Sequence, residues 1–271
     1  MLKKSRLILF QIIAIAAMIP LAATPQVRAE PGTSAGQELG QRAYEKAEWV
    51  FDHASDVHYR HFKHPASEQV HDEDGRVISN NDCSGFVSYI IHSVAPKHYT
   101  PIRDRQSERP YPQAKVYAHF FGSLSQDSAQ DGWIKVGSFR ELRRGDFIAW
   151  VKGGSSPDHG GHGNSGHVMI VRDQPGEPYT QEIGGTKYRL VNVPVLDSSS
   201  MYHFQPEVLP PQAGQQHRDG LGKGDIKLVL DEQGKAIGYW EGSFWGEGNK
   251  EVRHPTESTA IHFGRLVSNL N

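Results

Sequence analysis

The chain has 271 residues, of which 29 are Lys or Arg, 31 are Asp or Glu, and one is cysteine. This length allows one or two domains and can bury a hydrophobic core without a disulfide or a structural metal. A single cysteine excludes an intramolecular disulfide, and the near-neutral charge argues against a nucleic-acid-binding protein. The 22% of charged and 10% of aromatic residues are typical of an ordered globular protein.

The first thirty residues have the pattern of a secretory signal peptide. Three basic residues among the first six precede an apolar run over residues 7–23, and residues 27–29 offer a small-residue cleavage site. The alternative is an uncleaved membrane anchor, but the run is shorter than the ~20 residues that a spanning helix needs. We expect residues 1–29 to be removed, which leaves a periplasmic or secreted protein without a stable membrane anchor.

Helical periodicity dominates the first half of the mature chain, and strand patterns dominate the second. The expected helices cover residues 39–54, 86–94 and 116–121. The expected strands cover residues 133–139, 147–151, 167–171, 188–195, 225–230, 236–240 and 261–266. Residues 53–75, 97–112 and 153–166 have the composition of loops. Helices followed by strands predict an α+β fold, with N-terminal helices packed on a small antiparallel sheet.

The lone cysteine is the most informative residue, because an exported protein either buries a free thiol or keeps it for chemistry. Asn81 or Asp82 can cap a helix whose first turn contains Cys83. Free backbone N–H groups and the positive end of the helix dipole favour a thiolate there, and the same N–H groups can bind an oxyanion. Position alone leaves two interpretations open: a nucleophile, or a small buried core residue.

A thiolate nucleophile needs a base, and the chain contains 15 histidines. His167 is distinguished by its context, because it begins an apolar strand directly after a glycine-rich segment. The strand would fix the imidazole, while the preceding loop would leave its edge open to solvent. The alternative is a histidine at a strand end without any role, which is the usual situation for an arbitrary histidine.

The base in turn needs an acceptor that fixes its tautomer. Asp197 follows the apolar run 188–196, which we expect to lie beside the His167 strand across a hairpin. A carboxylate at the start of the next loop could then accept a hydrogen bond from the imidazole. The alternative is an ordinary turn aspartate, because Asp-Ser-Ser-Ser is common in loops.

Three segments in this order resemble motifs of a known family. They are Asp82-Cys83-Ser84-Gly85-Phe86-Val87, Arg144-Gly145-Asp146-Phe147-Ile148-Ala149-Trp150 and Gly166-His167-Val168-Met169-Ile170-Val171. The chain resembles the NlpC/P60 family of bacterial cysteine peptidases, within the papain-like group, over roughly residues 36–200. The resemblance implies that Cys83 is the nucleophile, His167 the base and Asp197 the third catalytic residue. It also implies hydrolysis of an amide in peptidoglycan stem peptides, commonly between γ-D-glutamyl and a diamino acid, through a thioester.

The chain departs from the family pattern in three places. The interval between Cys83 and His167 is longer than usual, and the third catalytic residue is most often His in the family, where Asp197 stands here. His203 is the second candidate for that position. The chain also continues well past the motifs. We therefore expect a signal peptide (1–29), an NlpC/P60-like catalytic core (30–200) and a C-terminal β extension of the same domain (201–271).

Two histidine-rich stretches suggest zinc binding as a second hypothesis. Their members are His53, His58, His61, His64 and His71 in the first stretch and His159, His162 and His167 in the second. The spacings match no HExxH or two-cysteine pattern, so we expect solvated polar loops, no metal and no cofactor. If zinc did bind, His167 would be a ligand, and the metal content of the purified protein would show it.

Two further hypotheses use the same fold. A non-catalytic module would bind cell-wall peptides without cleaving them, although the retention of Cys83, His167 and an acid argues for an enzyme. An acyltransferase would form the same thioester but pass the acyl group to an amine instead of water. We expect a monomeric enzyme whose partner is a cell-wall peptide.

Overall fold

The computed structural model describes residues 35–61, 63–151, 165–200, 219–240, 252 and 261–268. All of them belong to one compact unit, Thr33–Asn271. The predicted signal peptide lies outside the described residues, as do His159, His162, His203 and nearly all of the predicted loop 153–166.

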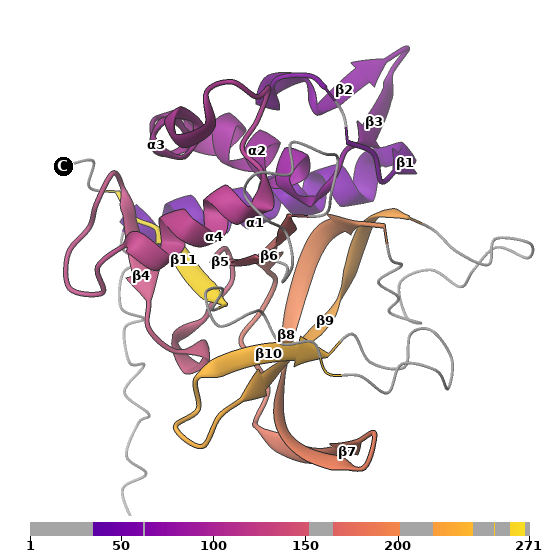
Figure 1. Ribbon diagram of the computed structural model, residues 1–271. Coiled ribbons are helices and arrows are strands. Elements are labelled where there is room, and N and C mark those ends of the chain that lie inside the picture. The colour runs from indigo at the N-terminus through magenta and orange to yellow at the C-terminus, as the bar shows by residue number, and fades with distance from the viewer. Residues whose placement is uncertain are drawn as a thin grey trace, which may run out of the picture. The chain divides into compact units, whose positions relative to one another are not determined.

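The described chain is mixed α and β, which confirms the predicted α+β class (Figure 1). The helices are α1 (Ala35–His53), α2 (Cys83–Val94), α3 (Pro96–Arg103) and α4 (Ala114–Ser123), with 3₁₀ turns η1 (Ala66–Glu68), η2 (Asp104–Gln106) and η3 (Phe139–Glu141). The strands are β1 (Ala54–His58), β2 (Val70–Glu73), β3 (Arg76–Asn80), β4 (Trp133–Val136), β5 (Phe147–Val151), β6 (Gly166–Val171), β7 (Tyr179–Ile183), β8 (Thr186–Ser199), β9 (Gly220–Leu230), β10 (Ala236–Trp240) and β11 (His262–Leu266).

The main sheet is antiparallel, with the strand order β10-β9-β8-β6-β5-β11-β4, and β7 pairs with the free end of β8. The C-terminal strand β11 lies inside this sheet, because Phe263 pairs with Ile148 of β5 on one side and with Val136 of β4 on the other. Residues near the end of the chain therefore complete the sheet that carries His167.

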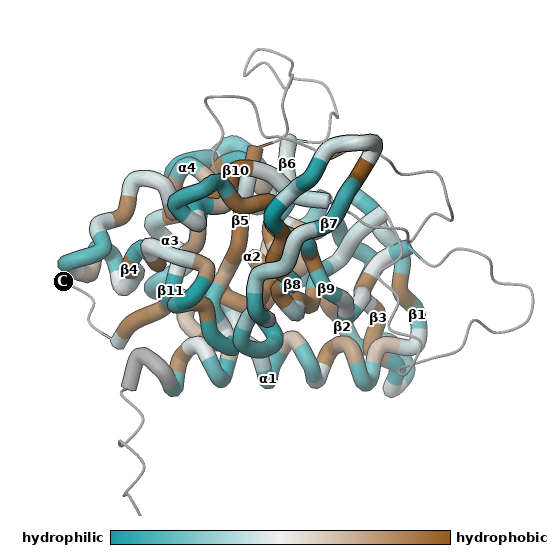
Figure 2. Tube along the Cα trace, turned by 90° about the horizontal axis from the view of Figure 1, so that it is seen from below, coloured by the Kyte–Doolittle hydropathy of each residue, from teal (hydrophilic) through white to brown (hydrophobic). Residues whose placement is uncertain are grey.

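Strand β5 and the part of β6 that follows His167 are apolar without interruption because both faces of the sheet are covered. Phe147 and Ala149 of β5 pack with α1, α2 and α4, whereas Ile148 and Trp150 point to a second core between strands. Figure 2 shows hydrophobic residues concentrated in β5 and α2, with many hydrophilic residues along α1.

The sheet curls around the second core. The ring centroids of Trp150 on β5 and Tyr239 on β10 are 4.5 Å apart. In a flat sheet these two strands would be about 19 Å apart, at ~4.8 Å per strand step. The curl brings β10 over the part of β5 that lies next to His167.

The Gly145-Asp146 motif serves the fold. A Cβ atom on Gly145 would lie 2.1 Å from the backbone oxygen of Gly40, so α1 can approach this turn only because Gly145 has no side chain. Asp146 accepts 2.8 Å hydrogen bonds from Nε and Nη2 of Arg265 on β11 and a 2.9 Å hydrogen bond from the N–H of Arg143. The motif therefore joins α1, β5 and β11.

Two loop predictions were wrong. The segment predicted as loop 53–75 contains β1 and β2, which form a second sheet with β3 in the order β1-β3-β2. The segment predicted as loop 97–112 begins with α3, in which Pro96 starts a helix instead of only ending the previous one. Strand β7 was also absent from the prediction. Among the described residues, no helix is long and apolar enough to cross a membrane.

Candidate active site

Cys83 is the first residue of α2 and is only 4% exposed. Asp82 is the N-cap, and its Oδ1 accepts hydrogen bonds from the N–H of Gly85 (2.7 Å) and from Ser84 Oγ (2.9 Å). The cap leaves the N–H groups of Cys83 and Ser84 without an intrahelical acceptor. These two groups, next to the thiol, are available for a developing oxyanion.

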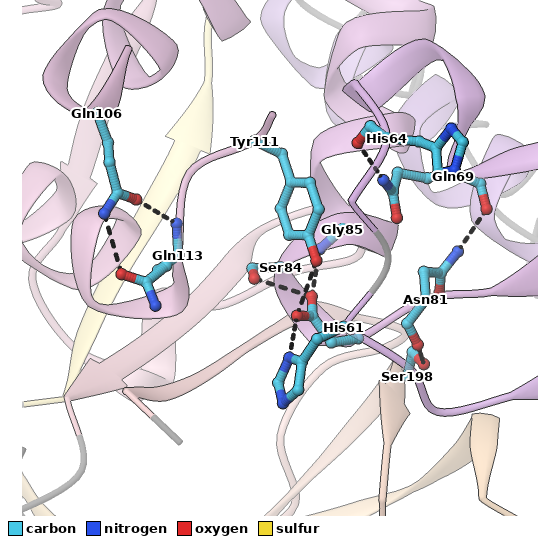
Figure 3. Close-up of polar contacts among 11 residues, drawn as sticks. His61, His64, Gln69, Asn81, Ser84, Gly85, Gln106, Tyr111, Gln113 and Ser198 are labelled. Atoms are coloured by element: carbon cyan, nitrogen blue, oxygen red, sulfur yellow. Dashed lines mark hydrogen bonds and ion pairs between the residues drawn. The ribbon is translucent and has the colours of Figure 1, made fainter. Parts of the chain in front are cut away.

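The second oxygen of Asp82 joins two other segments to the helix end (Figure 3). Its Oδ2 accepts hydrogen bonds from His61 Nδ1 (2.7 Å) and from the Tyr111 hydroxyl (3.0 Å). The hydrogen bond to Asp82 raises the pKa of His61. Burial, followed by the charge of Asp82, raises the pKa of Tyr111, so this hydroxyl remains a neutral donor.

His167 on β6 and Asp197 on β8 contact each other directly. Their strands are adjacent, with Ile170 opposite Leu196 and Val171 opposite Val195. His167 Nε2 is hydrogen-bonded to Asp197 Oδ2. The expectation that the strand before Asp197 lies beside the His167 strand is confirmed. Two details were wrong: Asp197 lies within β8 instead of in a following loop, and β8 forms its hairpin with β7.

His167 also interacts with Cys83, which is one of the causes of its shifted pKa. Because Asp197 occupies Nε2, Nδ1 is the ring nitrogen available to the thiol. Burial alone would lower the pKa of His167, but its interactions with Cys83 and Asp197 outweigh burial and raise this pKa well above the ordinary value. This environment stabilises the protonated form of the imidazole beside the Asp197 carboxylate.

Sequence reasoning missed two aromatic residues of the site. Burial raises the pKa of Tyr59, and the charges of Cys83, Asp82 and Asp197 raise it further, so Tyr59 lies within electrostatic range of the site. Trp150 lies with its ring centroid 5.4 Å from that of His167. Tyr59 belongs to a polar stretch that gave no signal, whereas Trp150 stands opposite His167 in the β5–β6 ladder and could have been found by pairing the two strands.

The histidines considered for zinc are dispersed among carboxylates. His58 lies within ion-pair distance of Asp56 and Asp219, and His64 lies 3.0 Å from Glu68. In the described part of the chain, no group of three or more His, Cys, Asp or Glu residues could hold a metal ion. His159 and His162 lie outside that part.

Comparison with known proteins gives one weak relationship. The chain is 25% identical to the uncharacterized protein R653 of Acanthamoeba polyphaga mimivirus over 191 residues, which are 68% of this chain and 78% of that protein. No family model matches the sequence. No solved structure matches either.

Proposed function

We propose that this protein is an exported cysteine amidase or endopeptidase of NlpC/P60 type, with a papain-like core, that hydrolyses an amide bond in peptidoglycan stem peptides. The observation that carries the proposal is the direct hydrogen bond between His167 and Asp197, together with the interaction of His167 with the Cys83 thiol at a helix N-terminus. A nucleophile, a base and an orienting acid in this order are the parts that thioester chemistry requires.

Each side chain has a defined task in the proposed reaction. His167 holds the proton of Cys83, and the thiolate attacks the amide carbonyl. The N–H groups of Cys83 and Ser84 stabilise the oxyanion of the tetrahedral intermediate. His167 then gives its proton to the departing amine, and water hydrolyses the thioester with His167 again acting as base.

The substrate class rests on the sequence. The predicted signal peptide would bring the enzyme to the cell wall, and the resemblance of the segments around Cys83, Gly145 and His167 favours a stem peptide cleaved after γ-D-glutamyl. A monomer in the periplasm or outside the cell is expected. The mimivirus relative carries no stated activity, so it gives no information about the substrate class.

The proposal is tested by the rate of Cys83 alkylation by iodoacetamide as a function of pH. A free thiol reacts with a midpoint near pH ~8.5, whereas a thiolate held by an imidazolium reacts well below pH ~7.5. We expect the low midpoint in the wild type and a shift toward the free-thiol value in His167→Ala. His53→Ala, an exposed histidine at the end of α1, is the control and should leave the profile unchanged.

Turnover is tested with γ-D-glutamyl-diamino acid peptides. Cys83→Ala should abolish cleavage and retain binding. An inert thiol, or identical alkylation profiles in the wild type and His167→Ala, would contradict the proposed mechanism. Binding of wall peptides by the wild type without cleavage would favour the non-catalytic module, and aminolysis exceeding hydrolysis would favour the acyltransferase.

A further inference from the structure

The end of β8 that carries Asp197 extends past the ladder to β6. The β6–β8 register consists of Ile170 opposite Leu196 and Val171 opposite Val195. Pairing of β8 with β9 continues farther, as far as Ser199 opposite Gly220. At this end of β8, Asp197 pairs with Gly222 of β9 and its side chain reaches His167 on β6.

Adjacent residues at this end of β8 point to opposite faces of the strand. Asp197 reaches His167 on one face. On the other face, Ser198 Oγ donates a 2.6 Å hydrogen bond to the backbone oxygen of Asn81, two residues before Cys83 (Figure 3). Ser198 and Asn81 are both fully buried, so water does not compete for this bond.

Asn81, whose backbone oxygen accepts this hydrogen bond, is itself held in place. Asn81 Nδ2 donates to the backbone oxygen of Gln69 (2.9 Å) and to Ser79 Oγ (3.2 Å). Gln69 in turn packs on the first turn of α2, where a Cβ on Gly85 would lie only 2.5 Å from Gln69 Oε1. The backbone before the nucleophile is therefore a fixed point, to which Ser198 attaches the strand of the acid.

We propose that Ser198 is a positioning residue of this site, which sets the distance between the element that carries Cys83 and the strand that carries Asp197. This inference rests on the proposed function. The catalytic groups belong to two separate elements, helix α2 and the main sheet, so their alignment depends on the contacts that join the two. Misplacement by about 1 Å can lower a rate by ~100-fold.

The test compares Ser198→Ala with Ser88→Ala. Ser88 is also fully buried, lies on α2 and forms a 2.7 Å hydrogen bond with the Tyr117 hydroxyl of α4, not with the strand that carries Asp197. We expect Ser198→Ala to slow alkylation at pH 6.5 by roughly 10- to 100-fold and to raise the midpoint of the profile. Ser88→Ala should lose stability to a similar extent and keep the wild-type profile.

A second pair of variants keeps the inference testable if Ser198→Ala does not fold. Ser198→Thr and Ser198→Val have nearly the same shape but differ in the hydroxyl. We expect the threonine variant to keep most of the reactivity and the valine variant to lose it. Equal reactivity of the two would overturn the role of the hydroxyl.

The titration of His167, followed by NMR of the imidazole, separates this inference from the proposed function. If the wild-type thiol has no low midpoint, the proposed function fails, yet Ser198→Ala should still bring the pKa of His167 back toward its ordinary value. An unchanged His167 titration in Ser198→Ala, or the same change in Ser88→Ala, would overturn the positioning role whatever the enzyme does.

Discussion

Asp197 is a carboxylate without exposure to solvent, which is costly unless its charge is matched by a nearby partner. His167 supplies that partner through Nε2 and is itself only 16% exposed. The same contact that makes the buried charge tolerable also leaves Nδ1 as the ring nitrogen available to Cys83. Stability and chemistry are therefore coupled at this residue.

Asp197→Asn should separate the two effects. The amide keeps the shape of the side chain but removes the negative charge that raises the pKa of His167, so this pKa should fall. It also no longer enforces the reactive tautomer, and we expect hydrolysis to fall by roughly 10²- to 10⁴-fold. The measurements are kcat/KM on a wall peptide and the NMR titration of His167.

Asp173→Asn is the matched control for Asp197→Asn. Asp173 is an exposed aspartate 3.6 Å from Arg144, and its amide variant should behave as the wild type. A His167 titration that is unchanged in Asp197→Asn would show that the carboxylate does not interact with the imidazole in solution.

Some residues of the site have a signal in their local sequence, whereas others depend on partners that are distant along the chain. Cys83 and His167 could be found because each stands in a local pattern, a capped helix start and an apolar strand. Ser198 could not be found, because its partner Asn81 is 117 positions away along the chain. Asp197 was placed in a loop because Asp-Ser-Ser-Ser is polar, whereas the curled sheet buries this stretch as the end of β8.

At the scale of elements, the contact between α1 and the turn before β5 depends on one glycine. Gly145 has φ 85° and would place a Cβ 2.1 Å from Gly40. Gly185, in the β7–β8 turn, has nearly the same φ of 83°, but its Cβ would meet nothing within 4 Å. The two glycines share the backbone conformation and differ only in that the backbone of α1 lies close to Gly145.

Gly185→Ala should therefore cost about 1 kcal/mol of unfolding free energy, from backbone strain alone. Gly145→Ala should cost several-fold more, on the order of 3–5 kcal/mol, because α1 must move away from the turn. Urea unfolding of both variants measures the difference. Similar losses of unfolding free energy for the two substitutions would show that the close approach of α1 does not exclude a side chain at position 145.

Elements with a clear apolar pattern could be predicted even when they are short, as for β5 and β10, whereas elements without such a pattern could not. The pattern of α2 covers three helical turns and ends where predicted, at Val94. The strands of the small sheet have only four or five residues, with polar side chains on both faces, so no period-2 pattern forms. The position of β11 between β4 and β5 also escaped prediction, because strand order depends on packing and not on local sequence.

At the scale of the whole molecule, histidines with raised pKa values and a histidine with a lowered pKa make the stability of the fold change with pH in opposite directions. The raised pKa values of His61 and His167 stabilise the fold below pH ~6.5, and this contribution disappears as the pH rises through the folded-state values. His262 on β11 behaves differently. Burial, together with Lys135, His119 and Lys235, lowers its pKa to about 4.

The contribution of His262 to stability is therefore present above pH ~6.5 and is lost as the pH falls toward 4, because the unfolded chain binds the proton more readily. His262→Gln removes this proton uptake, so its unfolding free energy should fall less between pH 6.5 and 4, by roughly 1–2 kcal/mol after allowance for partial exposure. Urea midpoints measured across this range test the slope. His53→Gln should keep the wild-type slope, and a wild-type slope in His262→Gln as well would mean that the acid sensitivity of the fold arises from other groups.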